Sequence, residues 1–312
     1  MMTVEKGIQD FLSHCQYEKG LSPKTLSAYR IDLRQFCEFL TEHHQPQQLW
    51  AIDRKVLRLY LEQLAQWKPK TIKRKVACLK ALFNHLEFED YIPVSPFRKM
   101  RVRIKEPRQL PVVMTQKEVA SILSTAYQRK AATPKTQVGN YAEVVRNVAI
   151  IELLFATGIR VSELCSLQPE QINLQNGLIK VKGKGSKERI VQVIHPAALE
   201  ALQEYALLFQ APITAQNSFF INRLGKELST QSVRHLIRNL VKQSSLNKSI
   251  TPHTFRHTFA TLLLEEDVDI KYIQHFLGHS SIMTTQIYTH VNKEKQRQIL
   301  EERHPRGRLE VR

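Results

Sequence analysis

The chain has 312 residues, of which 42% are hydrophobic and 24% are charged, as in a soluble globular protein long enough for two domains. Its 46 lysines and arginines outnumber 29 acidic residues and give a formal net charge of +17, which favours a polyanionic partner, nucleic acid first. No apolar run approaches the roughly 20 residues of a membrane-spanning helix, and no signal-peptide core is present, so a cytoplasmic protein without a membrane partner is expected.

Four helices are predicted in the first hundred residues, because apolar residues recur there at helical spacing and no strand pattern appears. Ser22 followed by Pro23 is typical of a helix start, with serine as N-cap and proline at the first helical position. The other helices are expected over about 3–19, after Asp53, and over about 69–89. The N-terminal part is therefore predicted to be a small all-helical domain.

Basic residues are concentrated between Arg54 and Lys80, a stretch with a single acidic residue, Glu62. Several stand at the start of the fourth helix, where a helix N-terminus already favours anions. Contact with DNA is therefore predicted; a merely solvated basic face, which would usually mix lysine with glutamate, is the alternative. The residues expected to contact DNA, two of them from the segment that follows, are Lys68, Lys70, Lys73, Arg74, Lys75, Arg101 and Arg103.

Four prolines between residues 91 and 111 break the helical pattern, in a stretch rich in arginine and lysine. This composition predicts a helical domain over 1–104, a basic linker over 105–111 and a second domain over 112–312. A basic linker between two basic domains fits a clamp that closes around a duplex. An ordinary solvated connector is the alternative.

The second domain opens with a capping box over 115–118, which predicts a helix start. The polar stretch 127–141 contains a proline and a glycine and is predicted to be a loop. An apolar helix should follow from Ala142 and end at Gly158. Further helices are expected over 196–209, after Ser229-Thr230 and after Thr251-Pro252, with a short strand over 218–221.

The one clear β pattern lies over 177–194, where two short strands flank the turn G-K-G-S-K-E. The glycines predict a tight turn with Lys184 at its tip, usually a solvated position but here one able to reach into a groove. The predicted fold is thus mainly α with a small β-hairpin or sheet. It consists of a helical N-terminal domain followed by an α+β domain.

Arg160 stands between apolar residues just after a helix-ending glycine. It should therefore be partly buried, and a buried arginine needs an anionic partner. Glu163 could supply that partner within the protein, and an external anion is the other possibility.

The four cysteines are far apart and show no C-x-x-C spacing, which indicates neither a zinc ribbon nor a disulfide framework. Their apolar or helical contexts are typical of small buried residues. These residues are Cys15, Cys37, Cys78 and Cys165.

The last sixty residues carry polar groups at spacings that helix packing alone does not require. His253 and Arg256 are three apart and share a helix face. His279 follows a helix-ending glycine, and Tyr288 lies near the end of the next expected helix. His253 and His257 are four apart, as zinc ligands can be, but no H-E-x-x-H motif and no third ligand accompany them, so no metal is expected.

The segments T-G-I-R-V-S-E-L, G-K-G-S-K, H-T-F-R-H and L-G-H…Y together resemble the motifs of the tyrosine recombinases, the lambda-integrase and Xer-like DNA strand-exchange enzymes. The resemblance covers nearly the whole chain and implies a helical domain that binds the core site, followed by a catalytic domain. The long polar stretch 127–141 departs from many compact members. The residues that match the family's catalytic positions are Arg160, Lys184, His253, Arg256, His279 and Tyr288.

This resemblance implies that Tyr288 attacks a DNA phosphate and forms a 3′-phosphotyrosine bond, which a free 5′-hydroxyl later reverses, without ATP, metal or another cofactor. Two arginines can stabilise the negative charge that develops on the non-bridging oxygens of the phosphate in the transition state. A histidine can move the phenolic proton, and Lys184 can protonate the leaving 5′-hydroxyl.

The implied partners are double-stranded DNA and a homotetramer on paired sites, with or without a second recombinase, in the bacterial cytoplasm at the nucleoid. The family packs a tail such as 292–312 onto a neighbouring subunit; a tail folded onto its own subunit is the alternative. A type IB topoisomerase that acts at a single site and an idle DNA-binding regulator are the competing functions. Chromosome-dimer resolution and integration of a transposon, plasmid or phage are all compatible with the sequence.

Overall fold

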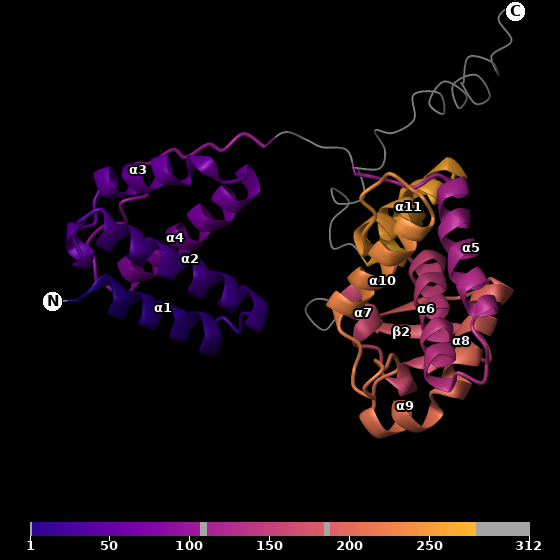
Figure 1. Ribbon diagram of the computed structural model, residues 1–312. Helices are drawn as coiled ribbons and strands as arrows, with labels where there is room; N and C mark the ends of the chain where they lie inside the picture. Colours follow the sequence, from indigo (N-terminus) through magenta and orange to yellow (C-terminus); the bar gives the residue numbers. More distant parts are fainter. Residues whose placement is uncertain (1, 107–110, 184–187, 279–312) are drawn as a thin grey trace, which may run out of the picture. The chain divides into compact units, whose positions relative to one another are not determined.

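The computed structural model describes residues 2–106, 111–183 and 188–278 (Figure 1). The chain forms two compact units, Met1–Gln109 and Leu110–Arg312, which divide within the segment expected to be a linker. The predicted fold class, mainly α with a small β-sheet, is confirmed. Within the described ranges, no helix is both long and apolar enough to cross a membrane.

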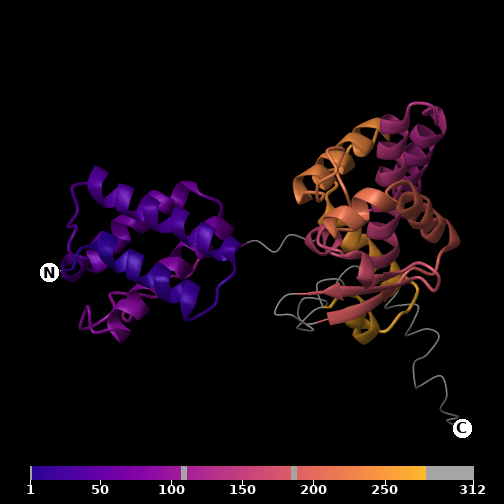
Figure 2. The same ribbon diagram turned by 90° about the horizontal axis from the view of Figure 1, so that it is seen from below.

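The first unit is a group of packed helices (Figure 2), and their buried apolar side chains form one common core. The predicted starts are confirmed: Ser22 Oγ accepts the backbone N–H of Thr25, and Asp53 accepts those of Lys55 and Val56. The elements are α1 (Val4–Tyr17), α2 (Pro23–Glu42), α3 (Arg54–Gln63) and α4 (Pro69–Phe88), with the 3₁₀ turns η1 (Leu49–Ala51) and η2 (Leu64–Gln66).

After α4 the chain runs back over this same core in an extended segment. Val102 and Ile104 pack against the core, whereas Arg101, Arg103 and Lys105 are exposed. This alternation is that of an extended chain with one apolar and one solvated side. These basic side chains, including Lys105 at the start of the expected linker, therefore belong to the surface of the first unit.

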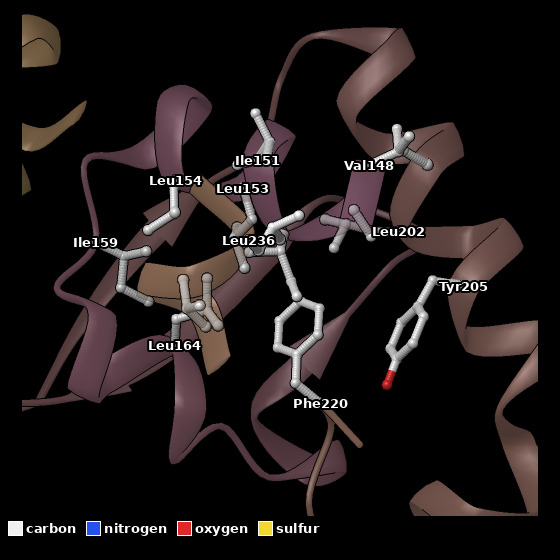
Figure 3. Close-up of a cluster of buried hydrophobic side chains, with 14 of the residues drawn as sticks. Val148, Ile151, Leu153, Leu154, Ile159, Leu164, Leu202, Tyr205, Phe220 and Leu236 are labelled. Atoms are coloured by element: carbon white, nitrogen blue, oxygen red, sulfur yellow. The ribbon is translucent and has the colours of Figure 1, made fainter. Parts of the chain in front are cut away.

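In the second unit α6 is central, with α5 and α8 packed beside it (Figure 1). Side chains from α6, α7, α8 and α10 meet in its core, together with Phe220 (Figure 3). Because α6 is covered on several sides, it is apolar around most of its circumference. The helices are α5 (Gln116–Ala132), α6 (Val138–Thr157), α7 (Val161–Cys165), α8 (Pro196–Leu208), α9 (Gln210–Gln216), α10 (Thr230–Gln243), α11 (Pro252–Glu265) and α12 (Ile270–Leu277), with the 3₁₀ turn η3 (Pro169–Gln171).

The predicted loop over 127–141 is wrong. Helix α5 continues to Ala132, and α6 begins at Val138, so only a short connection separates them. Two tyrosines of the stretch are drawn inward: Tyr127 Oη donates to Glu152, and Tyr141 Oη donates to Glu204, both at 2.9 Å. These tertiary contacts extend the helices into sequence that is polar overall.

Three antiparallel strands form the sheet, in the order β1 (Ile172–Asn173), β2 (Leu178–Lys182) and β3 (Glu188–Gln192). The predicted hairpin is β2–β3, with Val181 opposite Arg189. The expected strand over 218–221 does not join this sheet; Ile221 forms only an isolated bridge with Glu227. The buried hydroxyl of Tyr205 holds this segment instead, donating to Phe219 O and accepting from Ile221 N.

Candidate active site

Arg160 lies at the junction between α6 and α7. Helix α6 ends at Gly158, whose φ of 59° is left-handed, and the chain turns there through buried Ile159. Arg160 is the N-cap residue of α7, and its backbone N–H donates to Glu163 Oε2 at 2.9 Å. Its side chain is one third exposed, and Nη1 donates to Glu163 Oε1 at 2.7 Å. The partner considered in the sequence, Glu163, is therefore present.

Arg189 of β3 contacts the same carboxylate, a relationship that the sequence did not suggest. Its Nη1 and Nη2 donate to the two oxygens of Glu163 at 2.9 and 2.8 Å, in the bidentate geometry that arginine favours. Both side chains are nearly inaccessible, at 8% exposure for Arg189 and 5% for Glu163. Burial alone would raise the pKa of Glu163, but hydrogen bonds from Arg189 and Arg160 outweigh it and hold that pKa below its usual range.

Arg256 reaches the junction from α11. A capping box between Thr251 and Thr254 starts this helix, with Pro252 in its first turn. Arg256 is 5% exposed. Its Nη1 donates to Gly158 O at 2.8 Å, and its Nη2 donates to Leu277 O at 2.5 Å.

The three arginines converge on the C-terminal end of α12. Arg189 Nε donates to Phe276 O at 3.0 Å, and Arg160 Nη2 donates to Gly278 O at 3.3 Å, while Arg256 contacts the carbonyl between them. The last carbonyls of a helix lack intrahelical partners and carry partial negative charge. Three guanidinium groups from three parts of the chain thus bind three successive carbonyl oxygens.

The histidines of α11 differ in their surroundings. His253 is exposed on the first turn, whereas His257 is partly buried. Burial, and then the nearby His253 and Arg256, lower the pKa of His257, so its neutral imidazole is favoured. Across the described residues, no group of three or more histidine, cysteine or carboxylate side chains could hold a metal ion.

The structure brings together Arg160 and Arg256 at the end of α12, and His253 lies one turn before Arg256 on α11, where it is exposed. The other three predicted catalytic residues, Lys184, His279 and Tyr288, lie outside the described residues. Lys184 falls between β2 and β3 in the sequence, and His279 directly follows Gly278, the residue that ends α12.

Sequence reasoning missed Arg189, although a signal was present. Side chains alternate along a strand, so Arg189 shares a face with Val191 and Val193, both of which are buried. Ile190, between Arg189 and Val191, faces the other side and is 57% exposed. An arginine on the buried face of a strand indicates an internal anionic partner.

The predicted DNA-contacting residues of the first unit are exposed, with one exception. The side chain of Lys75 is 3% exposed, and its ammonium lies 3.3 Å from Asp32 Oδ1 and 5.3 Å from the ring centroid of Trp67. It is therefore a core residue rather than part of the basic surface, because its position on α4 faces α2. The exposed set is Lys68, Lys70, Lys73, Arg74, Arg101 and Arg103.

Two family models match the chain. The model of the phage integrase family matches residues 112–295, and that of the phage integrase N-terminal SAM-like domain matches residues 8–90. Among curated proteins, a tyrosine recombinase of Agathobacter rectalis is 46% identical over 308 residues, 98% of each chain. Tyrosine recombinase XerC of Thermodesulfovibrio yellowstonii is 37% identical over 96% of each chain, and XerD of Staphylococcus aureus is 36% identical over 97% of this chain and 100% of its own.

Solved structures are similar in fold. The XerH recombinase bound to its palindromic difH substrate, a post-cleavage complex, gives a TM-score of 0.73 at 22% identity, over 95% of this chain and 85% of that one. A lambda integrase dimer bound to a COC′ core site gives 0.70 at 20% identity, over 92% and 95%. The XerA recombinase gives 0.53 at 27% identity, over 97% and 99%.

Proposed function

The chain belongs to the phage integrase family of tyrosine recombinases, site-specific enzymes that act on DNA, and on that premise we propose that it cuts and rejoins DNA strands through a 3′-phosphotyrosine bond to Tyr288. We propose further that the reaction needs neither ATP nor metal. The observation that carries the proposal is the convergence of Arg160 and Arg256 on the carbonyls of Gly278 and Leu277, ten or so residues before that tyrosine.

These two guanidinium groups suit the transition state of phosphodiester cleavage. Attack on phosphorus adds negative charge to the non-bridging oxygens, and preorganised N–H donors stabilise it. Arg160 has five N–H donors, and the bonds to Glu163 and Gly278 occupy two of them. With a side chain one third exposed, it can offer the others to a phosphate.

Cleavage and rejoining also require proton transfers. The phenolic oxygen of Tyr288 attacks phosphorus, and its proton passes to His253 or His279. The bond between phosphorus and the 5′-oxygen breaks, and Lys184 donates a proton to that oxygen, which leaves as a 5′-hydroxyl. A 5′-hydroxyl of a second strand then displaces the tyrosine, which conserves the phosphodiester energy.

A suicide substrate, nicked so that cleavage releases a short fragment, tests the reaction directly. The protein should form a covalent adduct that Tyr288→Phe abolishes. Arg160→Ala and Arg256→Ala should each slow adduct formation by at least ~100-fold while DNA binding persists, since each removes a transition-state donor. Binding without an adduct would favour a regulator, and products formed without pairing of two sites would favour a topoisomerase.

The first unit supplies a surface suited to the DNA duplex. A cleft of about 400 Å³ lies between α4 and the extended segment. The basic side chains that line it are Lys73, Lys80, Arg103 and Lys105. Of these, Lys73 forms an ion pair with Glu106 at 2.8 Å. Because the pair is exposed, a phosphate can take the place of Glu106 at little cost in free energy. We therefore assign core-site binding to this face of the first unit.

We also infer a homotetramer on paired sites, in the bacterial cytoplasm at the nucleoid, in which the tail 292–312 contacts a neighbouring subunit. Deletion of that tail should leave binding to one site intact and abolish cooperative pairing of two. Unchanged pairing would mean that the tail folds onto its own subunit. Addition of a second purified recombinase would show whether a partner enzyme shares the work.

A further inference from the structure

We propose that Arg189 is a positioning residue for strand cleavage, which keeps Arg160 available to the DNA phosphate by neutralising Glu163. This role rests on the proposed function. It requires that Arg189 act through Glu163 rather than by touching DNA, and its contacts meet that requirement.

The hydrogen bonds to Glu163 are divided evenly between the two arginines. Each carboxylate oxygen accepts one bond from Arg189 and one from Arg160, at distances between 2.7 and 2.9 Å. A carboxylate saturated in this way cannot move toward either arginine without losing a bond to the other. Arg189 therefore fixes the position of the group that orients Arg160.

Charge gives Arg189 a second effect on Arg160. The set contains two guanidinium groups and one carboxylate, so it keeps a net positive charge toward a phosphate. Without Arg189, the charge of Glu163 would be balanced by Arg160 alone, and the pair would be neutral. Since the carboxylate is 95% buried, water would screen this loss poorly.

The guanidinium of Arg189 is turned away from solvent. Its side chain is 8% exposed and all three nitrogens donate to protein oxygens, two to Glu163 and one to Phe276. Gly278 completes the enclosure: a Cβ there would lie 3.0 Å from Arg189 Cδ and 3.1 Å from Nη1. A side chain at position 278 would therefore require Arg189 to shift by a few tenths of an ångström.

A charge-rescue experiment tests this role. Arg189→Gln should slow adduct formation on the suicide substrate by on the order of 10- to 100-fold, the scale expected of a misplaced catalytic group, with DNA affinity within about threefold of wild type. The double variant Arg189→Gln/Glu163→Gln should recover most of that loss, because the uncompensated carboxylate is gone and an amide oxygen can still accept a bond from Arg160. A purely structural role predicts the opposite, since the double variant loses even more hydrogen bonds.

The matched control is Lys180→Gln on the same hairpin. It removes the same charge and breaks an exposed pair, 2.6 Å from Lys180 Nζ to Glu188 Oε2, and it should cleave like wild type. If Arg189→Gln misfolds by circular dichroism, Arg189→Lys retains the charge but loses the bidentate contact with Glu163. It should cleave more slowly than wild type with unchanged DNA affinity, and a wild-type rate would overturn the positioning role.

The outcomes separate the two proposals. A wild-type rate in Arg189→Gln, or a double variant slower than the single one, would overturn the positioning role and leave the proposed function intact. A wild-type protein that forms no adduct would overturn both.

Discussion

Arg256 Nη1 donates a 2.8 Å hydrogen bond to the main-chain oxygen of Gly158, a residue 98 positions earlier in the chain. The glycine has two further constraints. Its φ is +59°, and a Cβ would lie 2.7 Å from Phe259 Cδ1 and 3.0 Å from Leu277 Cδ2. A turn that ends α6 therefore also serves as an acceptor for the arginine of α11.

Gly158→Ala should destabilise the second unit by about 2–5 kcal/mol, because it combines left-handed backbone strain with overpacking. Gly225→Ala is the matched control: its φ is +71°, but nothing lies within 4 Å of the added Cβ, so it should cost only about 1–2 kcal/mol. Urea unfolding followed by circular dichroism measures both. Both tryptophans, Trp50 and Trp67, lie in the first unit. The unfolding transition that their emission follows should therefore be the same in both variants as in the wild type. Equal costs for the two variants would contradict the packing argument.

Asp32→Ala should destabilise the first unit by about 3–5 kcal/mol, since it leaves the ammonium of Lys75 buried without its counter-charge. Both side chains are almost inaccessible, at 1% and 3% exposure. Asp32→Ala/Lys75→Met should regain most of the loss, because the methionine needs no counter-charge. Trp67, over which Lys75 lies, reports on the transition by its emission. A double variant no more stable than Asp32→Ala would show that the charge is not the cause.

Lys70→Ala should weaken DNA binding and reduce the slope of log affinity against log salt by about one, as expected when one phosphate contact is lost. Lys70 is exposed in the first turn of α4, within the basic surface. Lys6→Ala, on the exposed side of α1, removes the same charge from a helix outside the basic stretch 54–80. Fluorescence anisotropy at several salt concentrations compares the two. Identical salt slopes for both variants would mean that Lys70 does not contact a DNA phosphate.

The partly buried His257 should make stability depend on pH. Its folded-state pKa lies below the ordinary value of 6.5, so the unfolded chain binds a proton more readily. Stability is therefore full above that pH and falls as the pH decreases from 6.5 toward the folded pKa. In His257→Gln the slope of the free energy of unfolding against pH should be smaller, by the equivalent of up to one bound proton, between pH 7 and pH 5. A variant with the wild-type slope would mean that His257 is protonated equally in both states.

The family resemblance read from the motifs is confirmed by the family models and by relatives over the whole chain. Local signals were sufficient for helix starts, such as the Ser22–Pro23 cap and the capping box at Thr115, because the deciding atoms are within a few residues. The end of α6 at Gly158 followed from the same kind of local chemistry.

Sequence reasoning failed where distant contacts decide the structure. The stretch 127–141 is polar, yet tyrosine bonds to Glu152 and Glu204 make most of it helical. Lys75 belongs to a basic block by sequence, but Asp32, more than forty residues earlier, holds it in the core. Arg189 looked like part of an ordinary strand, and only the fold brings it to Glu163.

The arginine contacts also have a consequence for synthesis on the ribosome. They join residues 160, 189 and 256 to positions 276–278, across sequence separations of 118, 87 and 21 residues. The first unit is complete some 170 residues earlier, and N-terminal domains generally fold first during translation. A nascent chain would therefore expose a folded basic surface well before the three guanidinium groups could be gathered. If the first unit binds DNA as proposed, polypeptides released early would occupy DNA without being able to cut it.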